Sequence, residues 1–226
     1  MHNKRDRLPF DGVDVSNTSS ATSIVFGTLR QAIIEGKLAD GSPLRQEELA
    51  KKFNTSRIPI RESIARLAQE GFVEIIRYKG AIVAGISYKE VEEMFDLRAI
   101  VEGEVIYKAV ANIESTSLEQ AAIYAEKFAE SQSPKDWTQY NRLFHCLLYD
   151  AANLPFHMSI INSILDRTER YLRAQLVLSN GMQRAITEHQ QLLIFCRNKN
   201  AAAAKALTIE HVKHAKLSLL EFLNKN

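Results

Sequence analysis

The fold of the N-terminal part of this chain follows from residues 44–66, LRQEELAKKFNTSRIPIRESIAR. Apolar residues recur at steps of three and four on both sides of a short polar run, which predicts helices at about 46–53 and 57–70 joined by a tight turn. The face of the second helix that lies opposite its apolar residues carries Arg57, Arg61 and Arg66. A short helix, a turn and a helix with a basic face are typical of the helix-turn-helix that enters the major groove of DNA.

The segments on either side of this motif complete a winged helix. Before it, apolar positions at helical spacing predict a helix at about 24–35, with Thr22 or Ser23 as its N-cap. After it, two β-rich runs at 72–77 and 81–84, joined by a short turn, predict a hairpin. We therefore expect three helices and a β-hairpin in this part of the chain.

The pattern along the chain predicts three parts. Residues 1–20 are polar and predict a disordered tail, residues 21–86 hold the winged helix-turn-helix, and residues 87–226 carry no strand signal. In the last part, helices are predicted at about 87–112, 117–131, 136–152, 156–179, 183–198 and 200–223. Because short joints favour antiparallel neighbours, the expected fold is mainly α, with an all-α antiparallel bundle of six or seven helices behind the winged helix.

Composition limits the class of protein. The chain has 226 residues, of which 46% are hydrophobic and 25% charged, as in an ordinary globular protein. Its formal net charge is only +2, so any surface that binds nucleic acid must be local. The two cysteines are interpreted as packing residues of a protein in a reducing compartment. There is no apolar run of 18 residues and no signal-peptide pattern, so we expect a cytoplasmic protein without a membrane partner.

Polar side chains on the apolar stripes of several predicted helices point to one shared cavity. Asn141 and His145 lie four residues apart on one stripe, His189 lies in the middle of another, and His211 lies on or beside a third. Burying such groups without partners costs about 1–3 kcal/mol each, so the economical arrangement is that they meet. Three imidazoles and an oxygen ligand suit a divalent cation, with Zn²⁺ first and Ni²⁺ as the alternative.

The first predicted helix of the bundle carries an arginine and a glutamate on its apolar stripe. Arg98 and Glu102 are four residues apart, so they can form an ion pair within the helix. They can equally face the cavity and bind a small anionic effector. Both interpretations remain open from the residues alone.

Five sequence motifs together resemble the GntR family of transcription regulators, in its FadR subfamily, with a C-terminal ligand-sensing domain of the FCD type. The most specific is PLRQEELAKKFNTSRIPIRESIARLAQEGFVEIIRYKGAIV at 43–83. The weaker ones occur in the family's order: FDLRAIVEGE at 95–104, NRLFHCLLYDAAN at 141–153, EHQQLL at 188–193 and IEHV at 209–212. The resemblance covers nearly everything from residue 24 to residue 226.

The resemblance implies a regulator, most simply a repressor, that binds a palindromic operator in double-stranded DNA as a homodimer. Positions that match the family's DNA contacts are Arg45, Thr55, Ser56, Arg57, Arg61, Lys79 and Gly80. A small carboxylic acid would control the affinity for DNA, with Arg98 at the position expected to face its carboxylate. In metal-binding members an Asp precedes the first His by four residues; here that position is Asn141, and a neutral amide is a weaker ligand.

Two alternatives compete with this interpretation. A metal-dependent hydrolase could use the three histidines to activate water, but it would need a general base, and only Glu102 and Glu188 are candidates. No HExxH, GxSxG or P-loop motif is present, so we expect that the protein is not an enzyme. The other alternative is a regulator that binds its effector without metal. It differs only in the role of the three imidazoles.

Overall fold

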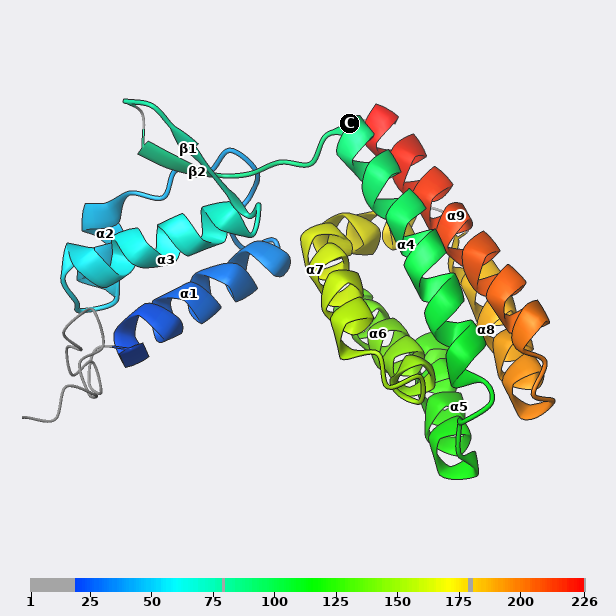
Figure 1. Cartoon of the computed structure of the whole chain (residues 1–226). Helices are drawn as coiled ribbons and strands as arrows, with labels where there is room; N and C mark the ends of the chain where they lie inside the picture. Colours follow the sequence, from blue (N-terminus) through cyan, green and yellow to red (C-terminus); the bar gives the residue numbers. More distant parts are fainter. Residues whose placement is uncertain (1–18, 79, 179–180, 226) are drawn as a thin grey trace, which may run out of the picture. The chain divides into compact units, whose positions relative to one another are not determined.

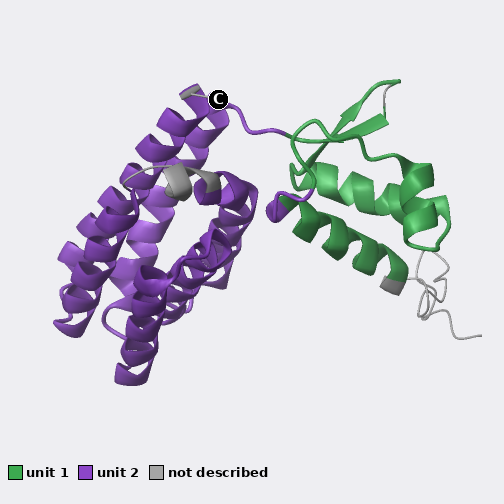
Figure 2. Ribbon diagram, turned by 180° about the vertical axis from the view of Figure 1, so that it is seen from behind, with its two compact units in different colours: residues 1–33, 38–84 green, residues 34–37, 85–226 purple. Residues whose placement is uncertain are grey.

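The computed structural model describes residues 19–78, 80–178 and 181–225. The predicted tail up to residue 18 and the predicted DNA contact Lys79 therefore lie outside the described residues. Contacts divide the chain into two compact units, residues 1–33 with 38–84 and residues 34–37 with 85–226 (Figure 2). No helix among the described residues is both long and apolar enough to cross a membrane.

The first unit contains three helices and a two-stranded sheet (Figure 1). Its elements are α1 (Ser19–Ile34), α2 (Gln46–Lys52), α3 (Arg57–Gln69), β1 (Val73–Ile76) and β2 (Gly80–Val83). The strands pair antiparallel with Val73 opposite Val83, and Pro43 forms an isolated bridge to Ile82. The predicted winged helix with its hairpin is therefore confirmed.

Helix α1 begins earlier than the sequence pattern predicted. Ser19 and Ser20, which were expected in the disordered tail, are helical, and Thr22 lies inside the helix rather than at its cap. The Thr22 hydroxyl donates to Glu62 of α3 at 2.9 Å, and the Ser63 hydroxyl of α3 lies 2.9 Å from the Thr22 carbonyl oxygen. These contacts with α3, which a local pattern does not contain, favour the additional turn of helix.

The core of the first unit holds α3 at a defined depth. Ile60, Ile64 and Leu67 are at most 3% exposed and form the apolar back that the sequence predicted. Gly71 ends the segment with φ at +75°, a left-handed conformation that glycine adopts without steric cost. Because its back is buried, α3 presents a single exposed face.

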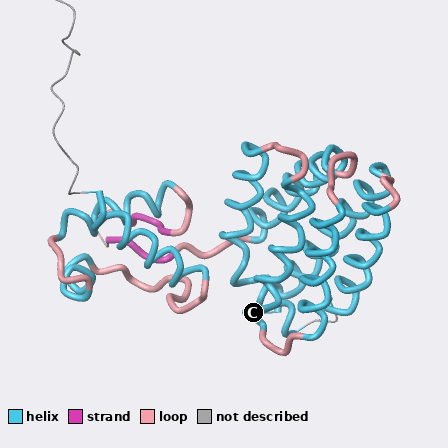
Figure 3. Tube along the Cα trace, turned by 90° about the horizontal axis from the view of Figure 1, so that it is seen from below, coloured by secondary structure: helices cyan, strands magenta, loops and turns pink. Residues whose placement is uncertain are grey.

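The second unit is a bundle of six helices with short connecting loops (Figure 3). They are α4 (Tyr88–Ala109), α5 (Ser115–Glu130), α6 (Pro134–Asp150), α7 (Pro155–Leu178), α8 (Gly181–Arg197) and α9 (Ala201–Lys225). Each lies within a few residues of its predicted range. At the start of α4, Ser87 and Glu90 form a capping box in which each side chain accepts from the other residue's backbone N–H.

Helices α4 and α9 pack closely along their length (Figure 1). A glycine permits this approach: a Cβ atom added at Gly103 would lie 2.8 Å from Cγ1 of Ile209. The neighbouring core contains Phe95, Val212 and Leu219, all at most 1% exposed. The position of α9 matters for the site because this helix carries His211.

Candidate DNA interface, metal centre and effector cavity

The exposed face of α3 carries the arginines that the sequence singled out. Arg61 is exposed, and Arg57 is exposed but lies 3.2 Å from a carboxylate oxygen of Glu47. Arg45, just before α2, similarly pairs with Glu48 at 2.9 Å, which raises the pKa of its guanidinium. Exposed ion pairs of this kind contribute only about 0–1 kcal/mol, so a phosphate can replace the carboxylate at little cost.

The N-terminus of α3 offers further groups to an anion. Ser56 occupies the N-cap position, and its side chain makes no capping hydrogen bond there. Thr55, immediately before it, is partly exposed. Free backbone N–H groups and hydroxyls at a helix N-terminus form a suitable site for a DNA phosphate.

Two residues of α3 behave differently from what the charge pattern indicated. Arg66 lies over the ring of Phe26 on α1, with its guanidinium carbon 3.8 Å from the ring centre, so it also supports the packing of the unit. Ile58, which sequence reasoning passed over, is 58% exposed in the first turn of α3, between Arg57 and Arg61. The signal available in the sequence was that Ile58 lies off the apolar stripe of Ile60, Ile64 and Leu67.

The tip of the hairpin is also exposed. Tyr78 is 91% exposed, and the guanidinium of Arg77 lies 4.9 Å from its ring centre. Gly80 is exposed at the start of β2. Of the two predicted wing contacts, Gly80 is therefore at an accessible tip, and Lys79 is outside the described residues.

In the second unit, three helices bring three histidines together. His145 comes from α6, His189 from α8 and His211 from α9, and their ring centres are 5.0–5.2 Å apart. One ring nitrogen of each lies within 4.8 Å of the others. Nitrogen ligands of a tetrahedral zinc ion are separated by roughly 3.3 Å, so small side-chain shifts suffice for joint coordination.

The two inner histidines lack the partners that a structural role requires. His145 is 6% exposed and His189 is 1% exposed, and neither ring nitrogen of either has a hydrogen-bond partner among the described residues. Burial, together with the neighbouring His211, holds the pKa of both imidazoles well below the usual value. Both rings are therefore neutral with lone pairs available, so these residues fit a divalent cation.

His211 is oriented by a carboxylate. Its Nδ1 lies 2.7 Å from Glu188, and the second oxygen of Glu188 lies 2.6 Å from Nδ1 of His214. Burial alone raises the pKa of Glu188, but its hydrogen bonds to the two histidines lower it overall. A carboxylate on Nδ1 leaves Nε2 of His211 as the ligand atom, an arrangement common around protein-bound metals. His214 is thus a partner of Glu188.

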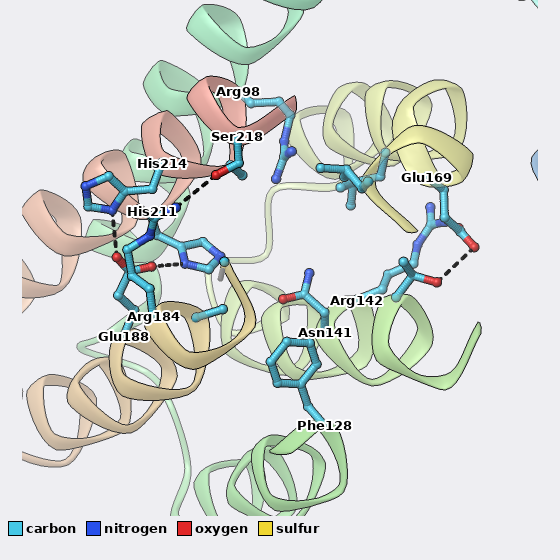
Figure 4. Close-up of a pocket in the computed structure, with 16 residues that line it drawn as sticks. Arg98, Phe128, Asn141, Arg142, Glu169, Arg184, Glu188, His211, His214 and Ser218 are labelled. Carbon is cyan, nitrogen blue, oxygen red and sulfur yellow. Dashed lines mark hydrogen bonds and ion pairs between the residues drawn. The ribbon is translucent and has the colours of Figure 1, made fainter. Parts of the chain in front are cut away.

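A cavity adjoins the histidine cluster. His211 forms part of its wall, and Asn141 of α6 and Arg98 of α4 point into the same space (Figure 4). The cavity is partly open to solvent and offers about 80 Å³ of space to the centres of water molecules. Its other polar lining residues include Thr138, Arg142, Glu169, Arg184, Glu188 and Ser218.

Glu102, one of the two candidate effector contacts, lies outside the cavity wall. It is 1% exposed and is not among the residues that line the cavity. One of its oxygens accepts from Nε of Arg98 at 2.6 Å, and the other accepts from the Tyr149 hydroxyl at 2.9 Å. The ion pair within the helix is therefore present, while Nη1 of Arg98 is buried without a hydrogen-bond partner among the described residues.

Sequence reasoning missed the residues that orient the cavity groups. The hydroxyl of Tyr149 donates to Glu102, but in the sequence Tyr149 cannot be distinguished from the other aromatic residues of α6. Glu188 was noted only as a general-base candidate, although it immediately precedes His189 on α8. Their partners lie on other helices, so no spacing within one helix could have indicated these contacts.

Comparison with known proteins gives two family matches. The model described as "Bacterial regulatory proteins, gntR family" matches residues 22–83, and the model described as "FCD domain" matches residues 93–214. The second match alone covers more than half of the chain.

Individual relatives agree with these matches over most of their length. The transcriptional repressor RspR of Escherichia coli K12 is 22% identical over 212 residues, which are 92% of this chain and 93% of that protein. The repressor GlaR of the same organism is 24% identical over 195 residues, 81% of this chain and 89% of that protein. These relatives are transcription regulators rather than enzymes.

Solved structures show the same fold. The structure of E. coli McbR/YncC is 20% identical, covers 92% of this chain and 99% of that one, and superposes with a TM-score of 0.74. The matched models, the winged helix and the six-helix bundle are thus consistent with one another. The chain belongs to the GntR family of bacterial transcription regulators, in the FadR-like group that carries a C-terminal FCD domain.

Proposed function

We propose that this DNA-binding regulator is a repressor whose affinity for its operator is controlled by a small carboxylic acid, bound beside a divalent cation in the cavity of the bundle. The observation that carries the proposal is the pair of buried, unpartnered imidazoles next to a cavity that contains Arg98. Buried polar atoms without partners are rare in native proteins, and such groups beside a cavity indicate a ligand.

Within this proposal, His145, His189 and His211 hold the cation, with Asn141 as the fourth ligand from α6. Zn²⁺ suits this nitrogen-rich set best, and Ni²⁺ is the alternative. When bound, the cation supplies a positive charge that attracts a carboxylate oxygen. Glu188 orients His211, and Glu102 with Tyr149 orients Arg98 toward the same anion.

The size of the cavity limits the effector. The centres of water molecules can occupy about 80 Å³ of it, so the cavity has room for more than a single water. A compact organic acid fits this space. Leu165, Leu172 and Ala215 line the cavity too, so the body of the acid meets apolar side chains while Arg98 binds its carboxylate.

In the first unit, α3 enters the major groove. Arg61 and Arg57 contact base edges or phosphates, and Thr55, Ser56 and Arg45 position the helix on the backbone. Ile58 supplies an apolar group between the arginines, where it meets the methyl group of a thymine. The hairpin tip at Gly80, with Lys79, reaches the minor groove.

A second copy of the chain completes the DNA-binding form. Leu97, Ile100 and Tyr107 are 44%, 69% and 47% exposed and lie at steps of three and seven on α4. Exposed apolar residues aligned on one helix face favour burial against another subunit. A homodimer with this face at its interface would present two α3 helices to the two halves of a palindromic operator.

A combined screen tests the proposal. Untagged protein is heated with small organic acids, with and without Zn²⁺, and each acid that raises the unfolding temperature is then tested on operator DNA selected from a random duplex pool. The expected result is an acid that changes operator affinity at least tenfold. In Arg98→Ala, the acid should no longer change operator affinity, while the operator affinity measured without the acid should equal that of the wild type. The proposal is wrong if stabilising acids leave operator affinity unaltered in the wild type.

A further inference from the structure

The ligand set proposed for the cation contains no negative charge. The three imidazoles bind as neutral groups, and Asn141 offers only an amide oxygen. A divalent cation that leaves water for a partly buried site loses hydration energy, and anionic ligands normally compensate for much of that loss. This site must obtain its compensating charge from elsewhere.

The nearby carboxylates are already engaged with other groups. Glu188 accepts from His211 and His214, and Glu102 accepts from Arg98 and Tyr149. Glu169, on the opposite side of the cavity, lies 3.3 Å from Arg173 and 3.6 Å from Arg142. None of these carboxylates can become a direct ligand without abandoning a partner that is buried or partly buried.

The charges around the cluster do not cancel once a cation is present. Next to the proposed ligands, Glu102 and Arg98 neutralise each other, and Glu188 offsets one of the two positive charges of the cation, so one positive charge remains there. Arg184 on the cavity wall, which donates to the Ser218 hydroxyl, is a further positive group. The unpartnered Nη1 of Arg98 adds a hydrogen-bond donor beside the same space. A single carboxylate in the cavity would neutralise the site and satisfy that donor.

We propose, on the basis of the proposed function, that the cation and the acid bind cooperatively, with each binding weakly on its own. The carboxylate of the effector supplies the anionic ligand that Asn141 does not provide. Thermodynamic linkage then requires that the acid raises the affinity for the cation by the same factor as the cation raises the affinity for the acid. The regulator therefore responds to the joint presence of a divalent cation and a carboxylate.

Calorimetric titration with Zn²⁺ tests this coupling in the full-length, untagged protein. Acetate is the minimal carboxylate probe, and chloride at equal ionic strength is the reference, with free Zn²⁺ corrected for its weak complex with acetate. In the wild type, we expect 20 mM acetate to tighten the dissociation constant of Zn²⁺ at least tenfold. In chloride alone, Asn141→Asp should bind Zn²⁺ at least tenfold tighter than the wild type does. Acetate should change the dissociation constant of Zn²⁺ for this variant by less than twofold.

A matched variant controls for net charge. Asn198→Asp adds the same charge at an exposed position after α8, outside the cavity lining, and should retain the full acetate effect. The coupling would be overturned, with the metal site left intact, if the wild type bound Zn²⁺ with equal affinity in acetate and chloride and Asn141→Asp bound it no more tightly than the wild type. Absence of Zn²⁺ binding by both the wild type and Asn141→Asp in both anions would instead overturn the metal site of the proposed function.

Discussion

The candidate functional side chains are exposed in the first unit and mostly buried in the second. In the first unit, Arg61 and Ile58 project into solvent from a helix whose other face is buried. In the second unit, His145 and His189 are buried and have no hydrogen-bond partners among the described residues. A group that contacts a macromolecular partner must be accessible and need not perturb its own domain. A group that holds a small ligand is buried even without the ligand, so it lowers the stability of the free protein.

Among the substitutions that test this comparison, His189→Leu has the largest expected effect. The substitution removes two unpartnered ring nitrogens from a site that is 1% exposed, and leucine has a similar volume. We expect affinity for Zn²⁺ to fall more than a hundredfold, since a direct ligand is at least as important as its supporting partners. At the same time, the unfolding free energy of the metal-free protein should rise by about 1–2 kcal/mol, because the cost of the unpartnered atoms disappears.

Calorimetry with Zn²⁺ and chemical denaturation in the presence of a chelator measure the two effects. His157→Leu, on α7 and outside the cluster, is the matched control and should retain Zn²⁺ affinity. If His189→Leu instead destabilised the metal-free protein and left Zn²⁺ affinity unchanged, His189 would be an ordinary core residue.

Arg61→Ala should have the next largest effect, and it acts on the other unit. The guanidinium is exposed on α3, so its loss should weaken specific operator binding by about 1–3 kcal/mol while leaving the stability of the protein nearly unchanged. Fluorescence anisotropy at one fixed salt concentration measures the affinity. Arg197→Ala, an exposed arginine at the end of α8, removes the same charge and should bind operator normally. Wild-type affinity in Arg61→Ala would place this arginine outside the DNA interface.

Ile58→Ala should have a smaller effect, of about 1 kcal/mol or roughly fivefold in operator affinity, because one apolar contact with a thymine methyl is lost. Replacing the contacted thymine by uracil removes the same methyl group from the DNA. Wild-type protein should lose about fivefold on this replacement, whereas Ile58→Ala should be insensitive to it. Ile75→Ala, which changes an exposed isoleucine of β1, is the control. If every uracil-substituted operator weakened both proteins equally, Ile58 would have no part in reading the sequence.

Much of the fold could be predicted from the sequence because its signals are local. All six helices of the bundle follow from apolar spacing and from breaks such as the one before Pro155. The histidines could be assigned to one cluster because each lies on the apolar stripe of a different helix. The additional turn of α1 could not be predicted, since it depends on contacts of Thr22 with α3, about 40 residues away.

The roles of the charged residues were harder to predict, because they too depend on contacts with other elements of the fold. Glu102 and Arg98 share a helix face, and only the position of Tyr149 on α6 shows that Glu102 is fully engaged within the protein. Arg66 reads as part of the basic face of α3, but Phe26 on α1 lies under its guanidinium. In each case the decisive partner belongs to a different element, and neither charge nor periodicity reveals which elements meet.

The smallest expected effect compares two helical glycines, one in each unit. A Cβ added at Gly103 of α4 would lie 2.8 Å from Cγ1 of Ile209, whereas a Cβ at Gly27 of α1 has nothing within 4 Å. Alanine favours the helix by about 0.5–1 kcal/mol over glycine at both positions, but overpacking costs about 1–3 kcal/mol at Gly103 only. Gly27→Ala should therefore stabilise the protein by about 0.5 kcal/mol, and Gly103→Ala should destabilise it by about 1 kcal/mol or slightly less.

Thermal unfolding followed by circular dichroism distinguishes the two variants, and Zn²⁺ titration adds a second measurement. Since Ile209 precedes His211 by two residues on α9, displacement of this helix in Gly103→Ala should also weaken Zn²⁺ binding, and Gly27→Ala should not change it. If Gly103→Ala were as stabilising as Gly27→Ala, the close packing of α4 against α9 would not restrict the position of His211. The buried cluster would then tolerate small displacements, as the exposed face of α3 is expected to do.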